Sequence, residues 1–317
     1  MKPIITLTLN PAIDGACEAD EVRPIRKIRT RNERYDPGGG GVNVSRVLSE
    51  LGGETLAIYM AGGATGPVFD ALLEARGVPR RRIDIVGHTR ISHAVFETSS
   101  GHEFRFVPEG PLVSAAECAR ALDAIRDADC EWLVASGSLP RGAPGDLYVR
   151  VGEAVRARGA RYVIDTSGDA LKQAVAAGGL HLIKPSLGEF ENLAGRKLTS
   201  HEEQERAAAE IVASGKVAIL AVTLGQEGAL LVDAEGAFRM PALPVEANSA
   251  VGAGDSFVAA MTLALARGRT PREAFVDGIA AGTAAVLTPG TELCKREDVD
   301  RLRAEAMRIA RKMGGLR

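Results

Sequence analysis

Continuous apolar runs of strand length alternate with amphipathic stretches of helix length along most of the chain. The strand candidates lie at Ile4–Leu9, Thr55–Met60, Trp132–Ala135, Tyr162–Asp165, Leu180–Ile183, Val217–Thr223 and Ala229–Val232. Several are apolar at every position, which is typical of strands covered on both faces. The helix candidates lie around Val42–Leu51, Val68–Arg76, Ala115–Ala128, Leu147–Arg158 and Glu202–Ala213. This alternation predicts an α/β fold with a mostly parallel sheet between two layers of helices.

Two segments do not follow this alternation. Glu18–Arg34 is rich in arginine and lysine without a helical stripe, and Ser92–Val107 alternates polar and apolar residues around a central Ser-Ser-Gly-His. The second pattern predicts a hairpin. We expect one large domain over residues 1–317, with insertions at about 15–36 and 88–108 that form a small β-sheet, a candidate lid.

Composition and charge exclude several classes of protein. Of the 317 residues, 45% are hydrophobic and 25% charged, the balance of a globular protein rather than a disordered one. Lysine and arginine total 39 and acidic residues 41, so the net charge is −2 and the isoelectric point is about 6.3. This chain lacks the basic footprint of a nucleic-acid binder, so any anionic ligand must be held by a local cluster.

No segment predicts a membrane span or a secretory signal. The longest apolar run, near Val217–Val222, is far shorter than the roughly 18 residues of a spanning helix. Met1–Leu7 holds one lysine and no apolar core with a cleavage site behind it. The four cysteines form no C-x-x-C pair, so a cytoplasmic location is expected rather than a disulfide scaffold or zinc knuckle: Cys17, Cys118, Cys130 and Cys294.

A run of four glycines, Gly38–Gly41, leads directly into an amphipathic helix. Glycine lets backbone N–H groups approach a ligand closely, and the helix adds its positive end. Asn43, one turn into the helix, can hydrogen-bond a hydroxyl group. A flexible turn is the alternative interpretation, and the run alone indicates only a polar ligand near the backbone.

A second glycine-rich segment precedes the apolar run Val258–Ala266, where a helix is predicted to begin at about Gly254. The small residues Gly252–Gly254 can form a nest of N–H groups suited to a negative oxygen. Asp255 lies in the first turn, where the helix stabilises a carboxylate by roughly 0.3–1 kcal/mol. Anion and base could therefore face one reacting centre, although an ordinary capping aspartate fits this pattern equally well.

Familiar catalytic motifs are absent from the sequence. No P-loop occurs, and the segment from Gly252 ends in phenylalanine and carries an acid that would repel a pyrophosphate. There is no G-x-S-x-G and no H-E-x-x-H. A dinucleotide-dependent dehydrogenase, a hydrolase triad and a zinc enzyme are therefore disfavoured.

Basic side chains gather in the two lid segments, where arginine can grip a phosphate bidentately and lysine can bridge phosphates: Arg23, Arg26, Lys27, Arg29, Arg31, Arg34, Arg90 and Arg105. A solvated charged face is the alternative interpretation for each of them. The run Arg80–Arg82 is interpreted as a solvated corner.

Small or polar residues follow four of the predicted strands. Asp14 follows the first, and Ser136–Pro140, Lys184–Glu189 and Thr223–Gly228 follow three others. Because ligands bind at the carboxyl ends of parallel strands, we expect these segments to line one crevice. Asp14 can accept bonds from sugar hydroxyls or cap a turn, and Glu189 can meet the water shell of a metal.

The motif order N-P-x-x-D, P-G-G-G-G-x-N, G-S-L-P-x-G, K-P-x-x-x-E, L-G-x-x-G and V-G-A-G-D-S resembles the ribokinase-like PfkB sugar kinases over essentially the whole chain, most closely their bacterial minor 6-phosphofructokinase branch. The resemblance implies a three-layer αβα sandwich with a β-sheet lid. It implies transfer of the γ-phosphoryl group of ATP, with Mg²⁺, to fructose 6-phosphate in glycolysis. The related 1-phosphofructokinases and tagatose-6-phosphate kinases remain alternatives, as does a non-catalytic sensor. A homodimer through the lid strands is also implied, with no nucleic-acid or membrane partner.

The resemblance also assigns roles to individual positions. Asp255 matches the general base and Gly252, Ala253 and Gly254 match the anion hole. The positions around the sugar and its phosphate are Asp14, Gly38, Gly39, Asn43, Lys27, Arg29, Arg90, Arg105 and Ser138, with Lys27 spanning both substrates. The positions on the nucleotide and Mg²⁺ side are Lys184, Ser186, Glu189, Thr223, Gly225, Gly228 and Ser249, with Glu189 reaching the metal through water.

Two positions depart from the family pattern. Ser186 stands where the family's N-x-x-E motif has asparagine, so contact with hydrated Mg²⁺ requires another water. In the loop that resembles a monovalent-cation region, Thr288 and Glu292 replace asparagine and arginine. K⁺ is therefore left open as a cofactor.

Overall fold

A nine-stranded sheet forms the centre of the computed structural model, which describes residues 2–316. Its order is β13-β12-β11-β10-β9-β8-β1-β4-β5, and the strands from β11 to β5 are all parallel. Only β12 and β13, at one edge, join by antiparallel pairing. The strands are β1 (Ile4–Thr8), β4 (Thr55–Gly62), β5 (Arg80–Ile85), β8 (Trp132–Ser136), β9 (Arg161–Asp165), β10 (Leu180–Ile183), β11 (Val217–Thr223), β12 (Ala229–Asp233) and β13 (Gly236–Met240).

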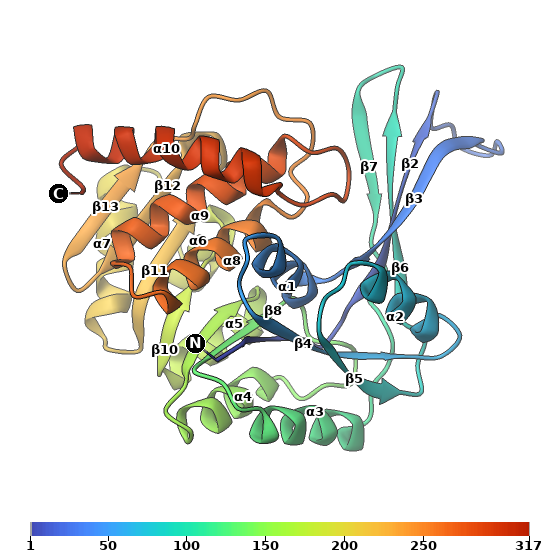
Figure 1. Cartoon of the computed structure of the whole chain (residues 1–317), viewed down its shortest axis with the longest axis horizontal. Helices are drawn as coiled ribbons and strands as arrows, with labels where there is room; N and C mark the ends of the chain where they lie inside the picture. The colour runs from blue at the N-terminus through green and yellow to red at the C-terminus, as the bar shows by residue number, and fades with distance from the viewer. Residues whose placement is uncertain (1, 317) are drawn as a thin grey trace.

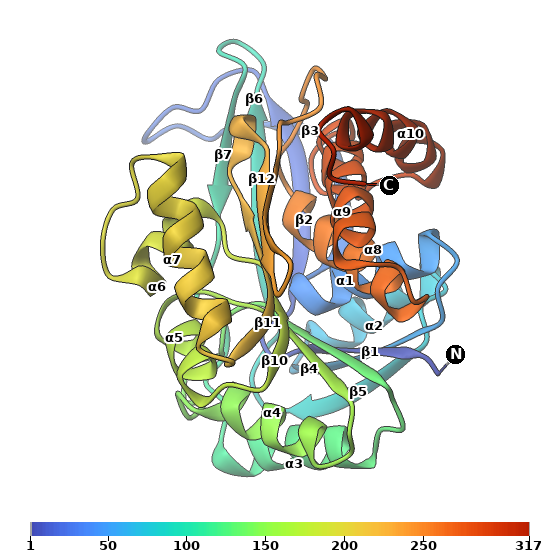
Figure 2. The same cartoon turned by 90° about the vertical axis from the view of Figure 1, so that its left-hand side faces the viewer.

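Helices cover both faces of this sheet (Figures 1 and 2). One hydrophobic cluster joins the sheet to α3 (Ala115–Asp127), α4 (Leu147–Arg156), α5 (Gly168–Ala177), α6 (Leu187–Ala194) and α7 (His201–Ala213). A second cluster on the opposite face holds α1 (Gly40–Glu50), α8 (Ala253–Ala266), α9 (Pro271–Val286) and α10 (Arg296–Lys312), and a third holds α2 (Gly66–Ala75). The predicted α/β sandwich is confirmed.

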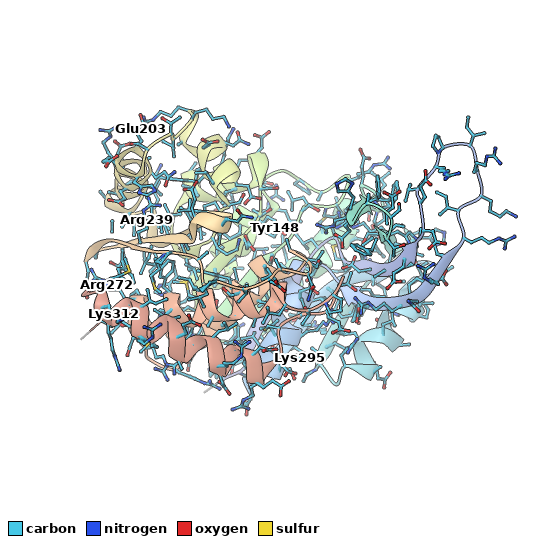
Figure 3. The ribbon with its side chains drawn as sticks, turned by 90° about the horizontal axis from the view of Figure 1, so that it is seen from above. Tyr148, Glu203, Arg239, Arg272, Lys295 and Lys312 are labelled. Atoms are coloured by element: carbon cyan, nitrogen blue, oxygen red, sulfur yellow. The ribbon has the colours of Figure 1, made fainter. Side chains whose placement is uncertain are left out.

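A separate four-stranded sheet projects from one end of the sandwich, at the upper right of Figure 1. Its order is β3-β2-β6-β7, with β2 parallel to β6 and the outer pairs antiparallel. The strands are β2 (Ala12–Ala19), β3 (Thr30–Gly38), β6 (Arg90–Glu97) and β7 (His102–Phe106). The β6–β7 hairpin forms around the predicted turn. The loop that joins β2 to β3 extends away from the body (Figure 3).

The interpretation of Arg80–Arg82 as a corner is wrong, although Arg81 and Arg82 are exposed as expected. These residues begin β5, which pairs in parallel with β4 at the sheet edge. The strand buries Ile83 and Ile85 on the α3 side. An edge strand with one solvated face accommodates arginine, so its composition resembles that of a surface loop. Strand β13 and the short helices α5 and α6 were not anticipated either. Within residues 2–316, no helix combines the length and apolarity needed to cross a membrane.

Candidate active site

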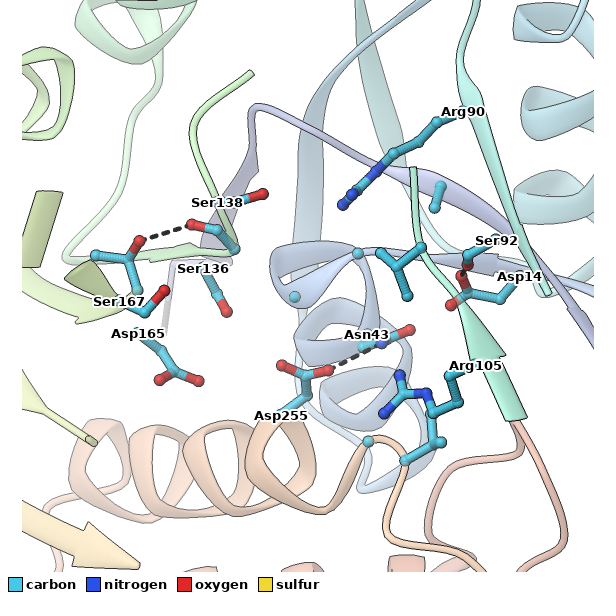
Figure 4. Close-up of a pocket in the computed structure, with 18 of the residues that line it drawn as sticks. Asp14, Asn43, Arg90, Ser92, Arg105, Ser136, Ser138, Asp165, Ser167 and Asp255 are labelled. Carbon is cyan, nitrogen blue, oxygen red and sulfur yellow. Dashed lines mark hydrogen bonds between the residues drawn. The ribbon is translucent and has the colours of Figure 1, made fainter. Parts of the chain in front are cut away.

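A cavity of about 350 Å³ lies at the carboxyl ends of the parallel strands, against the base of the second sheet (Figure 4). Ten of the residues singled out from the sequence line it: Asp14, Gly39, Asn43, Arg90, Arg105, Ser138, Lys184, Glu189, Gly252 and Asp255. They come from seven separate segments of the chain. The expectation of one crevice at this edge therefore holds for these residues.

Helix α8 begins at the wall of this cavity without a side-chain cap. Its N-cap is Gly252, whose φ of 73° is left-handed, and a Cβ there would overlap Leu293. The backbone N–H of Ser256 closes the first turn on Gly252 O at 2.8 Å. Because no side chain caps the helix, the N–H groups of the first turn can bind an anion from the cavity.

Asp255 sits in that first turn and points toward Asn43, with Asp165 on one side and Arg105 on the other (Figure 4). Asn43 Nδ2 donates to Asp255 Oδ2 at 2.9 Å. Burial raises the pKa of Asp255 to about 7, the nearby Asp165 carboxylate adds to the rise, and the bond from Asn43 opposes it. A carboxylate with a pKa near 7 is suited to accept a proton at neutral pH.

A buried lysine stands beside the start of α8. Lys184 follows β10, and its Nζ lies 3.2 Å from the place that a Cβ on Gly254 would take. The same Nζ pairs with Asp165 Oδ1 at 3.4 Å. Burial raises the pKa of Asp165, and the Lys184 charge opposes that shift. The absence of a side chain at Gly254 thus leaves space beside the Lys184 ammonium group, where an anion can bind at the start of α8.

The opposite wall comes from the second sheet and its neighbours. Asp14 on β2 accepts a hydrogen bond from Ser92 Oγ on β6. Burial raises the pKa of Asp14, while Ser92 and the charges of Arg90 and Arg105 lower it. The Arg90 guanidinium donates to Pro108 O at 2.8 Å and to Asn10 O at 2.9 Å, which fixes its position. Two guanidinium groups therefore flank one carboxylate at this wall.

Close packing accounts for part of the four-glycine run. A Cβ on Gly38 would overlap the Asp14 carboxylate, and one on Gly40 would overlap Ser136. A Cβ on Gly41 would lie 2.6 Å from Leu7 O. The run thus lets α1 and the second sheet meet the strand ends. Gly39 and Gly40 line the cavity, whereas Gly38 and Gly41 do not.

Several residues expected on the nucleotide side serve local structure. Ser186 caps α6 together with Glu189: the backbone N–H and the hydroxyl of Ser186 both donate to Glu189 Oε2 at 2.8 Å. Thr223 bridges to Ser186, and Gly228 packs against Met240 O. Of the residues expected on the nucleotide side, Lys184 and Glu189 line the cavity, whereas Ser186, Thr223 and Gly228 do not.

The remaining expected residues also lie outside the cavity. Ser249 donates to Gly290 O at 3.1 Å and so braces the loop before α8. Gly225 belongs to the short 3-10 turn Gly225–Glu227. Lys27 and Arg29 are exposed on the β2–β3 loop, at the end of the second sheet remote from Asp14. A substrate contact for them requires movement of this sheet and stays a prediction.

Sequence reasoning missed some residues that the fold brings to the cavity, chiefly Asp165 at the end of β9, Thr166 and Ser167 directly after it, and Ser92 on β6. Asp165 ends a predicted buried strand, the same signal that drew attention to Asp14. Ser92 faces the cavity only because β6 pairs with β2, which the sequence does not specify.

Comparison with known proteins identifies the family. The profile described as "pfkB family carbohydrate kinase" matches residues 8–298. The chain belongs to this family. It is 43% identical over 303 residues to an ATP-dependent 6-phosphofructokinase isozyme 2 of Mycobacterium tuberculosis, covering 95% of this chain and 89% of that protein.

The structural comparison agrees with this family. A crystal structure of Escherichia coli phosphofructokinase-2 in complex with fructose-6-phosphate superposes with a TM-score of 0.92 and 38% identity, over 97% of this chain and 100% of that one. A 1-phosphofructokinase of Borreliella burgdorferi is 31% identical over 94% of this chain and 96% of its own. This PfkB chain is thus more similar to the 6-phosphofructokinase isozyme 2 and to phosphofructokinase-2 than to the 1-phosphofructokinase.

Proposed function

We propose that this PfkB kinase transfers the γ-phosphoryl group of ATP to fructose 6-phosphate and forms fructose 1,6-bisphosphate. The observation that carries the proposal is the place of Asp255, a carboxylate with a raised pKa in the first turn of an uncapped helix. Asp255 and the N-cap residue Gly252 both line the cavity, whereas Ala253 and Gly254, the other residues expected in the anion hole, are not among the residues that line it. The greater similarity to proteins named 6-phosphofructokinase supports this choice of sugar.

In the proposed reaction Asp255 accepts the proton of the attacking sugar hydroxyl. The N–H groups at the start of α8 stabilise the negative charge on the transferred group, and loss of one such donor typically costs about 10²–10³ in rate. Lys184 adds a positive charge beside Gly254. Asp14 and Asn43 line the same cavity and are proposed to bind hydroxyl groups of the sugar, which would hold it against the base.

The sugar phosphate is proposed to lie between Arg90 and Arg105. Arg90 is fixed by backbone carbonyls, and its buried Nε has no hydrogen-bond partner among the described residues. Guanidinium groups bind phosphate with good geometry and charge. The fixed Arg90 would hold the phosphate at one end of the sugar, so that the hydroxyl at the other end meets Asp255.

The nucleotide phosphates and Mg²⁺ fit the other side of the cavity. The space that a side chain at Gly254 would fill, next to the Lys184 ammonium, matches a phosphate oxygen. Glu189 uses Oε2 to cap α6, which leaves Oε1 to bind water of the metal. No cluster of three His, Cys, Asp or Glu side chains in residues 2–316 is placed to hold a metal. Mg²⁺ bound to the nucleotide would neutralise phosphate charge.

Activation by potassium stays a prediction, and the contacts of Thr288 and Glu292 within the protein count against it. The Thr288 hydroxyl donates to Ala285 O at 2.8 Å, and Glu292 pairs with Arg34 at 3.0 Å. Both side chains that replace the family residues are therefore engaged within the protein.

The second sheet is proposed to act as a lid and as a dimer interface, with residues 1–317 as one domain. Tyr35, Gly15, His93 and Phe106 form one row on the face opposite Asp14. Tyr35 and Phe106 are 49% and 55% exposed. A second copy of the chain would cover these aromatic rings. A monomer mass for the wild type, measured by light scattering, would contradict the proposed dimer.

A sugar-phosphate panel with Mg²⁺ and ATP tests the proposed function, with ADP release as the readout. We expect rapid turnover of fructose 6-phosphate. Rapid turnover of fructose 1-phosphate or tagatose 6-phosphate without fructose 6-phosphate would move the chain to another PfkB activity. Binding of ATP and sugar with no ADP release would favour a sensor.

A further inference from the structure

A chain of partly buried polar side chains runs from Asp255, at the cavity wall, through Asn43 to Arg46 on α1. Asn43 donates to Asp255 through Nδ2, and its Oδ1 accepts from an Arg46 guanidinium nitrogen at 3.2 Å. Asn43 and Arg46 are three residues apart on α1, so their side chains are neighbours on the helix surface. Arg46 does not line the active-site cavity.

We propose that Arg46 is a positioning residue, whose guanidinium holds Asn43 in the one amide orientation that donates to the Asp255 carboxylate. A guanidinium has only donors, so it must face the amide oxygen. An amide turned by 180° would aim its oxygen at Asp255, and only the protonated acid could then bond to it. This inference rests on the proposed function, in which ionised Asp255 is the base.

Arg46 is itself held from another element. One guanidinium nitrogen donates to Pro37 O at 2.9 Å, and another lies 3.3 Å from Asp36 Oδ1, both on β3. Asp36 is buried and also accepts from Arg76 and from Thr291 Oγ1, the latter at 2.8 Å. Because Asp36 is already paired with the exposed Arg76 and bonded by Thr291, neutralising it does not account for the largely buried guanidinium of Arg46.

The other charged groups around Asp255 act by different routes. Asp165 and Asp14 raise its pKa and Lys184 lowers it, all through charge. The charged groups that face Arg46 are Asp36 and Arg76, with Asp14 and Asp255 itself at longer range. Among the described residues, only Arg46 donates to the amide oxygen of Asn43.

The test compares Arg46→Met with Arg76→Met. Both remove a guanidinium from Asp36, but only the first touches Asn43. For Arg46→Met we expect the acid limb of the kcat–pH profile to move up by about one unit. This shift gives about a fivefold loss of kcat at about pH 7 and about a tenfold loss at pH values well below the limb. KM for both substrates stays near the wild-type value. For Arg76→Met the limb stays in place.

Two further variants separate positioning from a merely structural role. Arg46→Lys keeps a donor for the amide oxygen, so it should restore most of the wild-type limb, and it serves if Arg46→Met does not fold. Adding Arg46→Met to Asn43→Ala should move the limb no further, because the route through Asn43 is already lost.

Chemical rescue provides an independent readout. Arg46 lines a second cavity of about 460 Å³ on the far side of α1, so guanidinium ions can enter Arg46→Ala at low concentration. We expect them to restore kcat in Arg46→Ala and to do nothing for Arg76→Ala.

A folded Arg46→Met enzyme with the wild-type acid limb would overturn the inference, and so would a further shift in the double variant. These outcomes leave the proposed function intact, because the wild type still turns over fructose 6-phosphate. A wild type that phosphorylates no sugar phosphate would contradict both proposals.

Discussion

Replacing Asp255 with asparagine should stabilise the fold while it removes the proposed base. The pKa of Asp255 is raised from 3.8 to about 7, so the folded chain binds this proton more tightly than the unfolded chain does. The protonated carboxyl therefore favours folding, and its contribution is lost as pH rises from about 4 through 7. Above pH 7 the wild type carries the full cost of a buried carboxylate.

The size of this effect follows from the shift. One pKa unit corresponds to about 1.4 kcal/mol, so a shift of about three units gives about 4 kcal/mol as an upper value at alkaline pH. At about pH 5.5 the same arithmetic gives about 2 kcal/mol. The asparagine amide of the variant stays neutral and can still accept the bond from Asn43. The variant's advantage over the wild type should grow by about 2 kcal/mol between about pH 5.5 and 8.5.

Urea unfolding followed by Trp132 fluorescence measures this difference at both pH values. Asp84→Asn is the matched control, because Asp84 is an exposed carboxylate paired with Arg82 and should change stability by less than about 1 kcal/mol at either pH. An Asp255→Asn protein that is less stable than wild type at the higher pH would refute the reasoning. So would an advantage that does not change with pH.

Three further predictions concern the cavity. In the wild type kcat/KM should rise with pH along a limb near 7, because Asp255 must be ionised in the free enzyme; a flat profile between about pH 6 and 8 would contradict this. Lys184→Met should lower kcat by about 10²-fold with the fold intact, as steady-state rates and circular dichroism would show. The methyl group of Gly254→Ala would contact only the flexible end of Lys184, so this variant should fold and show a reduced kcat. The methyl group of Gly40→Ala would overlap Ser136, so this variant should have a Tm lower by several degrees. Equal Tm values for the two variants would contradict this reasoning.

The sequence predicted the sandwich because most of its parallel strands are buried on both faces and therefore read as apolar runs. It did not reveal β5, an edge strand that begins with Arg80–Arg82 and whose arginines pair with carboxylates at the surface. Strand β13, at the other edge, escaped notice for a similar reason. An edge strand is partly exposed to water and therefore carries more polar residues than a central strand, so its residue pattern resembles that of a loop.

The candidate site was predictable where a residue follows a buried strand or starts a helix, as Asp14 and Asp255 do. The capping role of Ser186 was readable from its S-x-x-E spacing with Glu189, but the family motif drew attention to the metal instead. Arg46 and Asp36 carry no local signal. Their roles depend on α1, β3 and the loop at Thr291 meeting in space, which only the fold provides.

The turnover of fructose 6-phosphate by Asp255→Asn at saturating MgATP tests the central claim most directly. If this carboxylate removes the proton beside the start of α8, kcat should fall by about 10²–10⁴-fold. ATP affinity should stay within about tenfold, or 1.4 kcal/mol, of the wild type. A folded Asp255→Asn enzyme that phosphorylates the sugar at the wild-type rate would contradict the account.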